Sequence, residues 1–94
     1  MKSGAGNYPE AIKSKRQKAL WNNRKDWMFE GETDSEAEKA IIEADTAAEY
    51  DAGDGWWDSS STEAFLFQGL LKDLFPKRTE DQIYNLYKYL AQNT

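Results

Sequence analysis

The feature of this sequence that most constrains its fold is a pair of apolar stripes at helical spacing near its C-terminal end. The first stripe precedes Pro76 and consists of Ala64, Phe67, Leu70, Leu71, Leu74 and Phe75. The second consists of Ile83, Leu86, Tyr87 and Leu90. Apolar residues three and four positions apart share one face of an α-helix. The stripes therefore predict helices over residues 62–75 and from Thr79 onward, joined by a short link into an antiparallel hairpin.

A further helix is predicted near the N-terminus, over residues 9–29. Proline is favoured at the first position of a helix, where its missing N–H removes no hydrogen bond, and Pro9 fits this position. Gly31 is expected to end the helix. Its apolar stripe consists of Ile12, Ala19, Leu20, Trp27 and Met28. Arg16 and Asn23 interrupt the stripe, so we expect this helix to pack less well than the later ones.

A helix over residues 35–52 is predicted to pack through small side chains. Its stripe consists of Ala37, Ala40, Ile41, Ala44 and Ala48. Alanines allow close approach between helices but bury little apolar area. Gly53 is expected to end this helix.

The predicted helix starts carry the capping-box pattern, in which a Ser or Thr is followed three residues later by Glu or Gln. In this motif the two side chains bond to each other's backbone N–H groups at the start of the helix. The candidate pairs are Thr33 with Glu36 or Ser35 with Glu38, then Ser60 with Glu63, and finally Thr79 with Gln82.

No segment of the sequence predicts a β-strand. Valine is absent, isoleucine is scarce, and no stretch alternates apolar and polar residues. We therefore predict an all-α fold, a small bundle of three to four helices with the C-terminal antiparallel hairpin. Its 94 residues are expected to form one domain, with a flexible tail over residues 1–7 and a loop over residues 53–61.

Charge is distributed unevenly along the chain. Residues 1–28 contain seven Lys/Arg and two Asp/Glu, a net charge of +5. Residues 29–63 contain twelve acids and one lysine, a net charge of −11, and residues 64–94 have a net charge of +1. These three sum to the total of −5. A basic segment is thus followed by an acidic one and then by a nearly neutral apolar one, a layout that favours interaction with a charged partner.

Neither catalysis nor metal or cofactor binding is predicted. The chain has no histidine and no cysteine, the most common general base and the strongest nucleophile. Asp51, Asp54 and Asp58 lie around two glycines, as in a calcium loop, but Gly53 and Gly55 occupy positions where an EF-hand needs oxygen ligands. These aspartates are better interpreted as turn formers and helix-end charges. We therefore predict that the protein is not an enzyme.

No secretory signal or membrane-spanning segment is predicted either. The first six residues contain one lysine and no apolar run. No stretch approaches the roughly 20 apolar residues that span a bilayer. A cytoplasmic location and no membrane association are therefore expected.

Two adjacent tryptophans in the loop over residues 53–61 are the most unusual feature for function. Tryptophan is enriched among residues that dominate binding energy at protein interfaces. We expect one tryptophan to be buried and the other to lie at a contact surface. The predicted partner-binding residues are Trp56, Trp57, Asp54, Asp58, Asp51 and Glu49. They predict a non-catalytic protein-interaction module, which could serve as an inhibitor, an adaptor or an assembly subunit. The expected partner is a basic protein. A homo-oligomer is also compatible with the small core.

Two alternative functions remain open at this point. The first is nucleic-acid binding through the basic N-terminal helix, where helical spacing places Lys18, Arg24 and Lys25 around Trp21. The second is mimicry of nucleic acid by the acidic segment, which would occupy a nucleic-acid-binding protein. A structural interpretation of the same charges is that the basic and acidic helices pair with each other.

Overall fold

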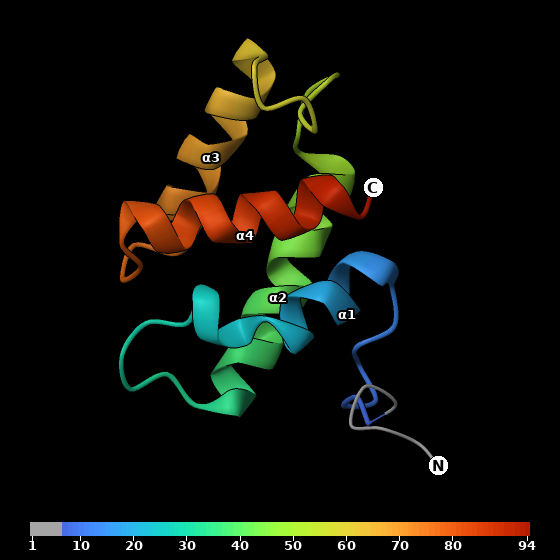
Figure 1. Cartoon of the computed structure of the whole chain (residues 1–94), viewed down its shortest axis with the longest axis vertical. Coiled ribbons are helices and arrows are strands. Elements are labelled where there is room, and N and C mark those ends of the chain that lie inside the picture. The colour runs from blue at the N-terminus through green and yellow to red at the C-terminus, as the bar shows by residue number, and fades with distance from the viewer. Residues whose placement is uncertain (1–6) are drawn as a thin grey trace.

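The computed structural model describes residues 7–94, which form four α-helices and one short 3₁₀ helix (Figure 1). In chain order they are α1 (Lys15–Asn22), η2 (Arg24–Asp26), α2 (Asp34–Tyr50), α3 (Thr62–Leu74) and α4 (Glu80–Gln92). The described residues contain no strand, which confirms the all-α prediction. The predicted flexible tail falls outside the described residues, except for Asn7.

Helix α4 is the central element of the bundle. It packs against α1, η2, α2 and α3, and Figure 1 shows it crossing the middle of the molecule. A short link over residues 75–79 joins α3 to α4 and forms the predicted helical hairpin. The hairpin is open, because the two ribbons cross steeply in Figure 1 instead of lying along each other.

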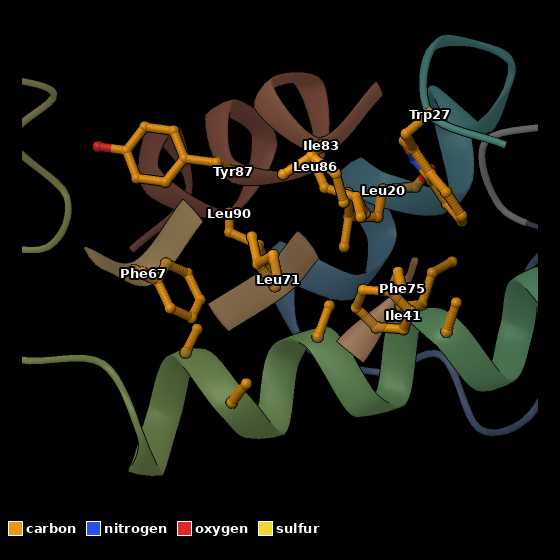
Figure 2. Close-up of a cluster of buried hydrophobic side chains, with 14 of the residues drawn as sticks. Leu20, Trp27, Ile41, Phe67, Leu71, Phe75, Ile83, Leu86, Tyr87 and Leu90 are labelled. Carbon is orange, nitrogen blue, oxygen red and sulfur yellow. The ribbon is translucent and has the colours of Figure 1, made fainter. Parts of the chain in front are cut away.

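The core forms where α1, α3 and α4 meet the alanine-rich face of α2. The largest fully buried side chains are Trp27, Tyr87, Leu20, Ile41, Leu71, Leu86 and Leu90. In Figure 2, Phe67 and Leu71 of α3 lie over α2, whose small side chains leave room for them. The alanines of α2 therefore contribute by allowing larger side chains to approach closely, as their spacing predicted.

The N-terminal helix is much shorter than predicted. It begins at Lys15, because Ser14 and Gln17 form a capping box that the sequence analysis missed. It ends at Asn22, where side chains bond to the free carbonyl groups of the last turn. The side chains of Asn23, Trp27 and Arg24 donate to the backbone oxygens of Ala19, Leu20 and Trp21, at 2.8, 3.0 and 2.8 Å.

The other helices begin close to their predicted positions. Thr33 with Glu36 and Thr79 with Gln82 form complete capping boxes at α2 and α4. Helix α3 begins at Thr62 as predicted, but its proposed N-cap was wrong by one residue: Ser61, not Ser60, is the N-cap and accepts from the N–H of Ala64. The Ser60 hydroxyl bonds instead to Asp58.

A buried ion pair joins the segment before α2 to the link between α3 and α4. Arg78 donates to Glu32 at 2.5 Å, and the two side chains are 3% and 2% exposed. The Arg78 guanidinium also lies 5.0–5.3 Å from the ring centres of Trp27, Phe29 and Phe75. Burial lowers the pKa of Arg78, although Glu32 acts in the opposite direction. This ion pair was not predicted from the sequence, since its two members lie 46 positions apart.

Candidate functional site

The candidate site is the tryptophan loop, which we define as residues 53–61 between α2 and α3. Trp56 anchors this loop in the core and is only 5% exposed. Its ring meets Phe67 and Tyr87 edge-on, with centres 5.0 and 6.2 Å apart. Its carbonyl oxygen accepts a hydrogen bond of 2.8 Å from the Tyr87 hydroxyl. The loop is therefore fixed to both helices of the C-terminal hairpin.

The neighbouring Trp57 lies at the surface. Its side chain is 51% exposed, and its ring meets that of Trp56 edge-on at 6.3 Å and 81°. The predicted split between a buried and an exposed tryptophan is thus confirmed. Because the backbone of Trp56 is held by α3 and α4, Trp57 extends from an ordered base.

The backbone of the loop depends on two glycines. Gly55 has a φ angle of +78°, a conformation that residues with a Cβ rarely adopt. Its carbonyl oxygen accepts from the Asp58 N–H and from the Ser61 hydroxyl, at 3.0 and 2.8 Å. A Cβ at Gly53 would lie only 2.0 Å from a carboxylate oxygen of Glu63. Gly53 therefore leaves room for the end of the Glu63 side chain beside the loop, although it was predicted only to end α2.

The predicted acidic residues of the loop are exposed, but they have different local roles. Asp51 follows α2 as its C-cap, and its N–H donates to the oxygen of Ala47. Asp54 begins the turn that leads to Trp56. Asp58 accepts from the N–H and hydroxyl of Ser60 at 3.0 and 2.8 Å, which lowers the pKa of Asp58 below its ordinary value. Asp58 is thus a turn former as well as a surface charge.

Replacing Ser60 by alanine is expected to raise the pKa of Asp58 toward its ordinary value, because it removes the hydroxyl donor. Since the folded-state pKa is lowered, the stabilisation by this turn is present above the unfolded pKa and is lost as the pH falls through the folded pKa. NMR titration of the side-chain carboxyl would measure this change. Ser59→Ala is the control, and equal pKa values in the two variants would contradict the assignment.

Glu49, the remaining predicted contact residue, belongs to a charge pair between α1 and α2. Arg16 donates to Asp45 at 2.5 Å and to Glu49 at 2.6 Å. Burial lowers the pKa of Arg16, but hydrogen bonds with the two carboxylates outweigh this effect and raise it. The predicted pairing of the basic and acidic helices is confirmed here. Asp45 is only 9% exposed, because it faces Arg16 and not the solvent.

The four residues proposed for nucleic-acid binding do not form an open stacking surface. Trp21 is half-buried and packs against the core. The Arg24 guanidinium lies 3.9 Å from its ring centre and also bonds to Asp34 at 3.2 Å. Lys18 and Lys25 are exposed. The arginine therefore occupies one face of the aromatic ring on which a base would stack.

Tyr50 is an exposed aromatic residue near the tryptophan loop in the chain that was not predicted from the sequence. It is the last residue of α2, next to Asp51, and is 79% exposed. Its exposure could have been predicted, because Tyr50 falls outside the apolar stripe that contains Ala44 and Ala48. A second exposed aromatic side chain thus borders the tryptophan loop in the chain.

Comparisons with protein-family models, curated proteins and solved structures found no match to this chain. Among residues 7–94, no helix is long and apolar enough to cross a membrane. The same residues contain no group of three or more Asp or Glu side chains placed to hold a metal ion.

Proposed function

We propose that the protein is a non-catalytic interaction module that binds a basic partner protein through the tryptophan loop. The observation that carries the proposal is the pairing of a buried Trp56 with an exposed Trp57. Aromatic side chains on an ordered base lose little entropy on binding and often dominate interface energy. An inhibitor, an adaptor and an assembly subunit all fit this description.

The charge around the loop supports a basic partner. Residues 40–71 contain seven acids and no lysine or arginine. Two of these acids, Asp45 and Glu49, are paired with Arg16. The exposed Asp51, Asp54 and Asp58 retain their negative field around Trp57. Such a field accelerates encounter with a basic surface and makes association sensitive to salt.

This arrangement favours protein binding over the two nucleic-acid alternatives. Binding of nucleic acid by α1 would require Trp21 to expose its ring, but Arg24 covers one face. Phosphate would also meet the neighbouring acidic segment, which weakens its attraction to the lysines. Mimicry of nucleic acid would use carboxylates alone and assigns no role to the exposed Trp57 and Tyr50.

Trp57→Ala is expected to reduce partner capture strongly while leaving the fold intact. Removal of an interface hot spot costs at least about 2 kcal/mol, or roughly 30-fold in affinity. The tagged protein would be incubated with nuclease-treated lysate of the cells that produce it naturally, and captured proteins would be quantified at low and high salt. Phe65→Ala is the matched control, because Phe65 is an exposed aromatic residue of α3, outside the tryptophan loop.

Three results together would support binding through the tryptophan loop. A defined protein must survive nuclease treatment, be released by salt, and be captured less by Trp57→Ala than by Phe65→Ala. Equal capture by both variants would reject the tryptophan loop as the binding surface. Loss of all captured protein after nuclease would instead favour nucleic-acid binding by the basic residues of α1 and η2. The charge-removing substitutions Lys18→Ala and Lys25→Ala would then test this alternative.

A further inference from the structure

A groove between α3 and α4 forms a second exposed apolar surface, separate in the chain from the tryptophan loop. Its volume is about 380 Å³. Its lining residues are Phe65, Leu66, Gln68, Gly69, Lys72, Glu80 and Ile83. Phe65 and Leu66 are 75% and 57% exposed, so they stand out beside the groove. Apolar side chains exposed together in this way commonly mark an interaction site.

The groove combines a projection and a hollow on one face. Phe65 and Leu66 project from α3, whereas Gly69, one turn further along the same helix, has no side chain. A Cβ placed at Gly69 would meet no other atom within 4 Å, so the space above it is open. A surface that carries both a projection and a hollow is able to match itself across a two-fold axis, where each copy fills the hollow of the other.

We propose that this groove binds a second copy of the same chain. The Phe65 side chain of one copy lies over Gly69 in the groove of its partner, and the reverse contact follows from the two-fold symmetry. Leu66 and Ile83 supply the surrounding apolar surface. This dimer contact does not depend on the function proposed for the tryptophan loop.

Charge favours a second copy over a strongly charged partner at this site. The lining contains one lysine and one glutamate, Lys72 and Glu80, and therefore has no net charge. Lys72 donates to the backbone oxygens of Pro76 and Arg78 at 3.2 and 3.0 Å, which holds its ammonium group at the end of the hairpin. Two copies of the groove therefore meet without repulsion between like charges. Two copies of the acidic tryptophan loop would repel each other.

The size of the apolar surface predicts a weak dimer. At exposures of 75% and 57%, Phe65 and Leu66 present roughly 250 Å² of apolar surface in each copy. Two copies bury roughly 500 Å² through these side chains, and the groove walls add to this area. Stable complexes bury at least about 1,200 Å² in total. We therefore expect a weak, reversible dimer and a monomer in dilute solution.

Sedimentation equilibrium of the full chain would measure this association, over a range from about 1 μM to about 1 mM protein. The expected result is a reversible monomer–dimer equilibrium that is not weakened by added salt. Phe65→Glu, which places a charge in the apolar contact, is expected to raise the dissociation constant at least about tenfold. Gly69→Leu, which fills the hollow, is expected to do the same. Trp57→Glu is the matched control and leaves the dimer unchanged.

Circular dichroism would verify that each variant retains its helices, which is expected because Phe65 and Gly69 are exposed. A monomer at every concentration would overturn the dimer proposal, as would a dimer that persists in both groove variants. A dimer weakened by Trp57→Glu and not by Phe65→Glu would move the contact to the tryptophan loop. Failure of the dimer proposal would not affect the proposed capture of a partner through Trp57, which is tested in a separate experiment.

Discussion

Glu32→Ala is expected to lower the free energy of unfolding by about 3–5 kcal/mol. The reason is the environment of Arg78, whose side chain is 3% exposed. Its Nε atom has no hydrogen-bond partner among the described residues, so Glu32 supplies the one carboxylate that compensates its buried charge. Without Glu32 the guanidinium must be buried unpaired or pull the link out of the core. Urea unfolding, followed by circular dichroism, would measure the loss.

Two controls separate the effect of burial from that of charge pairing. Asp34→Ala breaks the exposed pair with Arg24 and is expected to cost at most about 1 kcal/mol. The double substitution of Glu32 by leucine and Arg78 by methionine removes both buried charges and is expected to recover most of the stability lost in Glu32→Ala. If Glu32→Ala cost no more than Asp34→Ala, the buried pair would not stabilise the fold.

The ion pair is part of a wider attachment of the segment after α1 to α4. Gln82 donates to the backbone oxygen of Met28 at 2.7 Å, and Asn85 donates to that of Asp26 at 2.8 Å. The Tyr89 hydroxyl donates to the Asp26 carboxylate at 2.6 Å. These contacts hold residues 26–28 against α4, outside any helix that continues from α1. They fix the course of the chain after α1 has ended at Asn22, although its apolar spacing continues to Met28.

This difference shows which parts of the fold were readable from the sequence. Helices α2, α3 and α4 are defined by local signals, namely apolar spacing and a cap within four residues. The segment after α1, in contrast, is held by partners that lie in α4, more than 50 positions away. The pair between Glu32 and Arg78 is equally distant in the chain. Spacing predicts which residues share a helix face, but it does not identify the partner of a buried polar group.

The candidate site was also predictable in part. Adjacent residues cannot both enter the core from a short turn, so one buried and one exposed tryptophan could be expected from the pair alone. Which one is buried depends on Phe67 and Tyr87, which meet around Trp56 only after α3 and α4 pack. The groove that contains Gly69 was not foreseen for the same reason, because its shape depends on the crossing of two helices.

Trp56→Ala is expected to cost about 3–5 kcal/mol of unfolding free energy, because it leaves a large cavity between Phe67 and Tyr87. Trp57→Ala is the matched control: the same substitution at the next residue removes a half-exposed ring and is expected to cost about 1 kcal/mol or less. Urea unfolding of both variants would measure the difference.

Comparing the two variants also distinguishes a residue that supports the folded loop from one that contacts the partner. Trp56→Ala is expected to weaken partner capture through loss of the folded loop, and capture should recover under conditions that stabilise the fold. Trp57→Ala is expected to weaken capture while the protein remains folded, since its ring is the contact itself. If the two substitutions destabilised the protein equally, Trp57 would be a core residue and the tryptophan loop would lose its proposed anchor.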